Sequence, residues 1–221
     1  MVLLSLLSQA FAGTLAVLYF ENQGNPQLEP LKVGLSQMLI TDLKGAGDVK
    51  LVERAQLQAI LDELKLGHDG ITDPKTAAQV GKLLGADTLL LGSYFELMGT
   101  LRMDARLVKV ETGEVVHAHG VNDKTENFLS LEKQLAVSFR EALTVTQPRG
   151  SGATAAVPAP TLTVDVVRPD AKAMDAALAF SEGLILLDQK ELGRARESFQ
   201  KAVAADPRLD EARSQLAAMD L

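Results

Sequence analysis

The chain has 221 residues, of which 47% are hydrophobic and 23% are charged, a composition typical of a folded globular protein. Its net charge of -7 excludes the basic footprint that nonspecific nucleic-acid binding needs, and it provides no attraction to an anionic membrane. The sequence contains no cysteine, which excludes disulfides, thiolate metal sites and cysteine catalysis, and leaves no residue for a lipoprotein anchor.

Residues 1–12 have the pattern of a signal peptide. The apolar run Val2–Leu7 leads into Ala10-Phe11-Ala12, the small-x-small pattern that signal peptidase reads. We therefore expect a mature start at Gly13 and a periplasmic protein, associated with the outer membrane or free. No other stretch approaches the ~18–20 apolar residues of a transmembrane helix, so we expect a soluble mature protein. In the alternative, residues 1–12 are not a signal and the protein is cytoplasmic.

The first half of the chain predicts alternating strands and helices. Thr14–Phe20 is an apolar run of strand length, and the polar segment Glu21–Pro30 predicts a loop. An apolar stripe then predicts an amphipathic helix from Leu31 to Leu43, ended by glycines. Three further elements follow: a strand at Val49–Val52, a helix at Glu53–Leu66, and a helix that begins at Asp73-Pro74 and runs to Gly85.

The next segment predicts an antiparallel meander. Thr88–Met98 is an apolar β-run, Leu101–Val110 alternates apolar with charged residues, and Val115–Val121 returns after a turn. Tight reversals are expected at Gly99-Thr100 and within residues 111–114, and an amphipathic helix at 126–143. The fold class is therefore α/β (α+β), with a mixed sheet of about five strands covered by helices over residues 13–144.

The last part of the chain predicts a linker and a helical hairpin. Residues 145–168 are rich in Pro, Gly and Ala, with the β-prone run Thr161–Val167 near their end, and the chain is helical from residue 169 to 221. Small residues, an aromatic residue and a proline stand at the spacing of a tetratricopeptide (TPR) repeat: Gly183, Ala195, Phe199, Ala202 and Pro207. Only one such unit fits, with a capping helix at 210–220. It must dock on the α/β domain, on a second copy or on a partner.

An ordered series of short motifs resembles the CsgG and TolB-N-terminal-like group. The series comprises Ala16–Asn22, Gly34-Leu35, Met38–Leu43, Leu51–Arg54 with the leucines after it, Gly81–Ala86, Gly92-Ser93, Arg106–Val108 and Glu111–Val116. The resemblance covers about residues 14–143 and transfers fold better than activity, because these residues build strands, turns and helix starts. It implies an accessory factor in secretion, surface assembly or envelope maintenance. The tight turns without inserted hairpins imply that the chain forms no pore.

No catalytic, cofactor-binding or metal-binding residues are predicted. His117 and His119 fall on one face of a strand, but a metal site needs three or four ligands, so a solvated pair is the prediction. His68 lies in a polar loop. Carboxylates such as Asp62, Glu63, Glu191 and Glu197 are expected on solvated helix faces. The glycines at 45–47 and 150–152 lack the lysine and the strand-helix setting of a phosphate loop.

The sequence therefore predicts a non-enzymatic envelope protein that works by protein–protein interaction, with envelope or secretion components as partners and homo-oligomerisation as an option. Two alternatives stay open. One is a cytoplasmic sensory or scaffold module of the TolB-like/TPR type. The other is a ligand-binding domain or enzyme that uses the cleft at the carboxyl ends of the strands.

Overall fold

A computed structural model describes residues 13–66, 73–144 and 171–220. The expected signal peptide, the loop that holds His68, and the linker with its β-prone run lie outside these residues.

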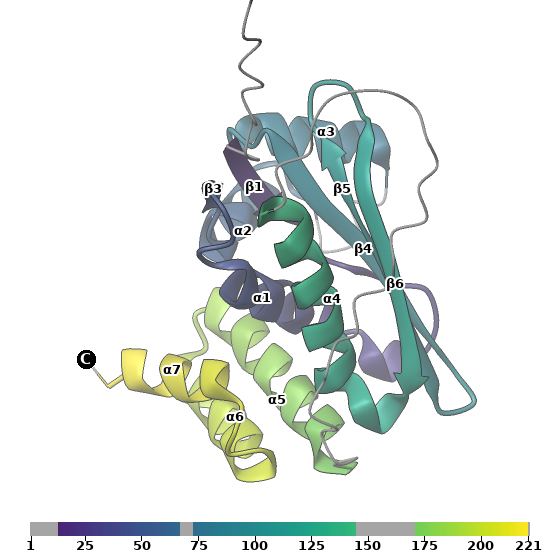
Figure 1. Cartoon of the computed structure of the whole chain (residues 1–221). Helices are drawn as coiled ribbons and strands as arrows, with labels where there is room; N and C mark the ends of the chain where they lie inside the picture. Colours follow the sequence, from purple (N-terminus) through teal and green to yellow (C-terminus); the bar gives the residue numbers. More distant parts are fainter. Residues whose placement is uncertain (1–12, 67–72, 145–170, 221) are drawn as a thin grey trace, which may run out of the picture.

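A mixed sheet forms the centre of the molecule (Figure 1). Its strands run in the order β3-β1-β4-β5-β6, with the short β2 paired to β4. The bounds are β1 Gly13–Val17, β2 Glu21–Asn22, β3 Val49–Leu51, β4 Thr88–Leu97, β5 Thr100–Lys109 and β6 Val115–Lys124. β1 pairs in parallel with β3 and β4, whereas β4, β5 and β6 are antiparallel.

Helices cover both faces of the sheet and form a C-terminal unit. The bounds are α1 Leu31–Leu43, α2 Arg54–Glu63, α3 Pro74–Leu83, α4 Phe128–Thr144, α5 Ala171–Asp188, α6 Leu192–Ala205 and α7 Asp210–Ala218, with 3₁₀ turns η1 at Pro26–Leu28 and η2 at Thr125–Asn127. The first half of this unit, α5 and α6, packs as a hairpin beside α1 (Figure 1). The predicted α/β class and element order are confirmed.

The sheet has one more strand than predicted. The backbone of Glu21 and Asn22 pairs with Ser93 and Tyr94, so part of the expected loop at Glu21–Pro30 is β2. The first strand is correspondingly shorter than predicted and ends at Val17. β4 extends well beyond β1, and a short strand there can satisfy its hydrogen bonds without any side-chain periodicity of its own.

Two other expectations need correction. The β4–β5 reversal is centred on Met98-Gly99, both with positive φ, one residue earlier than predicted, because Thr100 already pairs with Leu97. The expected amphipathic character of α1 is wrong. Within that helix only Gln37, Thr41 and Asp42 escape burial, because the sheet lies on one side and α4 and α5 on others.

A glycine in β4 lets a buried aromatic ring pack directly against the strand backbone. A methyl group on Gly92 of β4 would overlap the ring of Phe20, which is fully buried. Phe20 lies in the segment just after β1, so this contact constrains how the chain leaves the strand. The sequence Gly92-Ser93 thus has a packing role.

Gly92→Ala should lower the free energy of unfolding by about 1–3 kcal/mol, because a filled core must then accommodate an extra methyl group. Gly193→Ala in α6 is the matched control, since a Cβ there meets open space. We expect it to be neutral or to stabilise by at most about 1 kcal/mol. Urea unfolding of both variants provides the measurement, and an equal effect at the two positions would contradict the packing argument.

Candidate functional site

The C-terminal helices dock directly on the α/β domain through α5 and α1. The backbones approach closely where Gly34 faces Ser181, since a methyl group on Gly34 would overlap the serine hydroxyl. Both residues are fully buried, and the Ser181 hydroxyl donates to the carbonyl of Ala177 within its own helix. Of the three docking options left open by the sequence, the structure shows the docking within one chain.

Within the C-terminal unit, small residues let α5 and α6 approach each other. A Cβ on Gly183 would overlap the ring of Phe199, and Ala195 and Ala202 are fully buried. Asp206 caps the end of α6 and binds the Arg208 side chain at 2.9 Å. The helical hairpin is therefore confirmed as a structure, while its assignment to the tetratricopeptide type stays a prediction.

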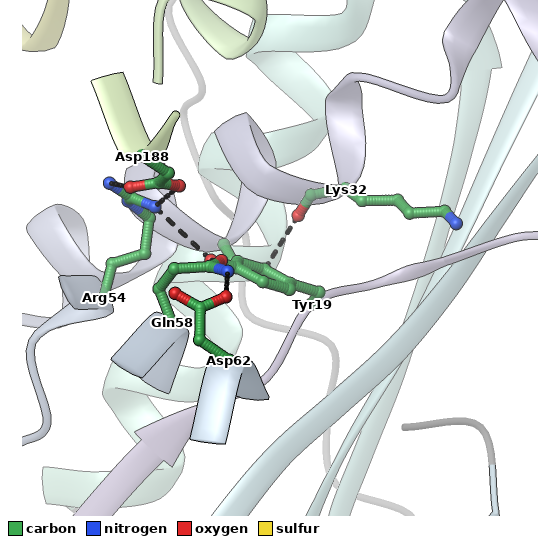
Figure 2. Close-up of polar contacts among 7 residues, drawn as sticks. Tyr19, Lys32, Arg54, Gln58, Asp62 and Asp188 are labelled. Carbon is green, nitrogen blue, oxygen red and sulfur yellow. Dashed lines mark hydrogen bonds and ion pairs between the residues drawn. The ribbon is translucent and has the colours of Figure 1, made fainter. Parts of the chain in front are cut away.

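A polar network joins the α/β domain to the C-terminal helices at one end of the contact between α1 and α5, which we call the seam (Figure 2). The Arg54 guanidinium at the start of α2 donates to both carboxylate oxygens of Asp188 at the end of α5, at 2.6 and 2.9 Å. Arg54 also donates to the Tyr19 hydroxyl at 3.3 Å, and that hydroxyl donates to Gln58 at 2.8 Å. Gln58 donates in turn to Asp62 at 2.8 Å. The network links the segment after β1 with α2 and α5.

Burial and charge act in opposite directions on this network. Burial raises the pKa of Tyr19 to about 12, although the neighbouring Arg54 charge opposes this. Burial lowers the pKa of Arg54, but its hydrogen bond to Asp188 and the charges of Tyr19 and Asp188 outweigh burial, and the net shift is upward. Arg54 therefore stays charged and Tyr19 neutral. The network can orient and hold two elements, and it offers no group poised for proton transfer near neutral pH.

A second feature lies on the face of the sheet that α4 does not cover. No described helix covers the middle of β4, β5 and β6 there. A cleft of about 410 Å³ opens there, between α3 and the segment after β1. Its walls include Tyr19, Lys32 and Ala77, and its floor includes Ser93 and Arg106. Strand order reverses around β1, and ligands of open α/β sheets commonly bind at such a point. The cleft is a candidate for a small-molecule site.

The predicted histidine pair is only partly solvated. His119 is exposed, but His117 is half-buried, lies 3.1 Å from the Ser138 hydroxyl and meets the edge of the Phe139 ring. Burial, with a smaller contribution from the His119 charge, lowers the pKa of His117. The strand face that carries the pair points towards α4, so His117 belongs to the packing between β6 and α4.

The remaining candidates stay apart. In the residues that the structure describes, no three His, Asp or Glu side chains gather in a way that could hold a metal. Gly45 and Gly47 adopt positive φ where the chain turns after α1, and a side chain on Gly47 would meet the carbonyl of Leu143. They are turn residues. Glycines 150–152 lie outside the described residues.

Sequence reasoning missed the junction that the structure reveals. The sequence around Arg54 indicates only a strand-helix start, and nothing near Asp188 distinguishes it from other acidic residues on helix surfaces. Their pairing spans 134 positions. A weak signal did exist, because only a single helical unit was present and had to dock somewhere.

Arg54→Met should lower the free energy of unfolding by about 2–4 kcal/mol, because Asp188 and Tyr19 would remain partly buried without their cation. The matched control is Arg102→Met, whose ion pair with Asp104 is exposed on the sheet. We expect the control to cost less than about 1 kcal/mol. Thermal and urea unfolding compare the two, and similar losses would show that Arg54 does not anchor the C-terminal helices.

Comparisons with known proteins agree with the motif series. A sequence model of the family described as "Curli production assembly/transport component CsgG" matches residues 9–97. Among curated proteins, no relative matches the chain. Among the helices that the structure describes, none is long and apolar enough to cross a membrane.

Three solved structures illustrate the structural similarity. The LpoB C-terminal domain from Salmonella enterica is 22% identical, with a TM-score of 0.44 over 53% of this chain and 85% of that one. The PelC dodecamer from Paraburkholderia phytofirmans is 14% identical, with a TM-score of 0.41 over 63% and 93%. TolB from Acinetobacter baumannii is 13% identical, with a TM-score of 0.38 over 60% and 28%. Similarity at this level supports no statement about function. The chain thus carries a CsgG-like region at residues 9–97.

Proposed function

We propose that this protein is an accessory factor of the bacterial cell envelope that acts by binding other proteins. The observation that carries the proposal is the match of residues 9–97 to the family of the curli production assembly/transport component. The predicted signal peptide supports an envelope location, and the proposed location is the periplasm or its outer-membrane side.

The arrangement of the C-terminal helices supports a binding role. One side of α5 packs on the α/β domain, and α6 covers another, so α6 and α7 carry the outer surface. On α6 that surface is exposed and charged, with Arg194, Glu197 and Lys201. We propose that this TPR-like unit presents a partner with a rigidly held helical surface, because its docking and the Arg54–Asp188 pair fix its orientation.

The protein is proposed to be non-enzymatic. The buried polar network pairs its charged groups with one another, and the pKa directions of Tyr19 and Arg54 keep both in their ordinary protonation states. A catalytic site would instead require a base or nucleophile activated near neutral pH.

A photo-cross-linking residue at Lys201 of α6 should form an adduct with a discrete envelope protein in cells of the native host. With that partner purified, Arg194→Glu combined with Lys201→Glu should weaken binding at least tenfold, since both side chains are exposed on the proposed surface. Lys50→Glu, an exposed substitution on β3, is the control and should leave affinity unchanged. Equal affinities for all three proteins would contradict the proposed surface.

Cell fractionation and N-terminal sequencing test the location. A mature start at Gly13 in the periplasmic fraction is expected. An intact Met1 in the cytoplasm would contradict export and favour the cytoplasmic scaffold or sensory module.

The cleft on the open sheet face favours a second candidate function, the binding of a small molecule. Ser93→Trp would fill the floor of the cleft without touching α5–α7. Native mass spectrometry of the protein purified from its host tests this: a bound small molecule that Ser93→Trp removes, with partner binding intact, would favour a ligand-binding domain.

A further inference from the structure

The most unusual buried group in the described chain is a glutamate on α4. Glu132 is 1% exposed, no donor is bonded to either of its carboxyl oxygens, and in its neutral form the group can donate a hydrogen bond to Asp42. It shares a helix face with Phe128 and Ala136, both buried, at the spacing of successive helical turns. An ionised carboxylate is costly in such a place, so burial favours the neutral carboxyl group.

The charges around Glu132 come from three elements. α1 contributes Asp42, α4 contributes Lys133, and α7 contributes Glu211. The Lys133 ammonium lies 2.6 Å from Asp42 but 3.8 Å from Glu132, so this cation chiefly neutralises Asp42. In α5, by contrast, Lys172, Asp175 and Glu182 are exposed and Asp188 is bound to Arg54.

Burial is the main cause that raises the pKa of Glu132 well above its ordinary value. The negative charge of Asp42 raises it further, and so does that of Glu211. The Lys133 charge acts in the opposite direction and is outweighed. Of these contributions, the charge of Glu211 comes from the C-terminal helices, and α5 packs against α4.

The position of Glu132 connects it with docking. α4 contacts both α1 and α5, and Glu211 belongs to the C-terminal unit (Figure 1). When α5–α7 leave the α/β domain, water reaches this part of α4 and Glu211 moves away. Both changes restore an ordinary environment, in which the carboxyl group ionises readily.

We propose that Glu132 makes the docking of the C-terminal helices pH-dependent: the helices stay docked while its carboxyl group is neutral and are released as it ionises. Below the ordinary carboxyl pKa, Glu132 is protonated in both states and docking is at full strength. As the pH rises from there through the raised pKa of the docked state, only the undocked state can ionise. Docking therefore weakens across this window.

The consequence is a switch in the exposed surface. Release would uncover the sides of α1 and α4 that α5 now buries, and it would free α6 and α7 from their fixed orientation. The inference rests on the docking geometry alone and does not require the proposed function.

A distance measurement in the full chain tests the switch. Because the chain has no cysteine, Glu111→Cys and Lys201→Cys provide two unique labelling sites, both exposed, one on each side of the seam. Energy transfer between donor and acceptor labels is followed from about pH 5 to about pH 9, the range in which buried glutamates ionise. The ratio of undocked to docked molecules should rise about tenfold or more over this range.

Three variants of the labelled protein test whether Glu132 causes the pH dependence of docking. Glu132→Gln and Glu132→Leu remove the ionisable group, so docking should become independent of pH. Glu141→Gln replaces an exposed glutamate of the same helix and should behave like the wild type. Circular dichroism confirms that each variant is folded. A wild type without pH response, or a Glu132→Gln protein that keeps the full response, would overturn the proposal. Partner binding does not enter this readout, so the two proposals can fail independently.

Discussion

The whole structure depends on the burial of α1 on three sides. Its residues are apolar or small almost all round, and ten of the thirteen are buried. The sheet covers one side, α4 a second and α5 a third. An apolar side chain stabilises by about 1.5–3 kcal/mol when fully buried, so the release of α5 costs free energy for each apolar side chain of α1 that it exposes. The C-terminal helices are therefore part of the domain's core and not an independent appendage.

This constraint explains why polar groups are concentrated at the seam. Gly34 and Ser181 allow the backbones to approach, and the Arg54–Asp188 pair fixes the orientation at one end. Glu132 introduces the opposite tendency, a buried group whose ionisation disfavours the docked state. A well-packed seam with one buried titratable group, Glu132, suits a protein that holds its C-terminal helices in one state and releases them in another.

The sequence predicts the strands and helices of the α/β domain well, because each has a local cause. Alternation at Leu101–Val110 and the Asp73-Pro74 helix start depend on neighbouring residues alone, and both are confirmed; Asp73 accepts a hydrogen bond from the Thr76 amide. Contacts between distant segments could not be predicted in this way. β2 forms because β4 extends far enough to pair with it. The face of α1 that was expected to contact solvent is buried by α5, which lies far along the chain. The Arg54–Asp188 pair and the buried Glu132 arise likewise from tertiary packing, which no local pattern encodes.

Native-state hydrogen exchange can show whether α1 and the C-terminal helices form one cooperative core. Amide protection in α1 and α5 is measured by mass spectrometry in the intact protein as denaturant is raised below the unfolding transition. We expect the same opening free energy and the same denaturant dependence for both helices, because the release of α5 exposes α1. Exchange of α5–α7 at low denaturant while α1 stays fully protected would contradict it.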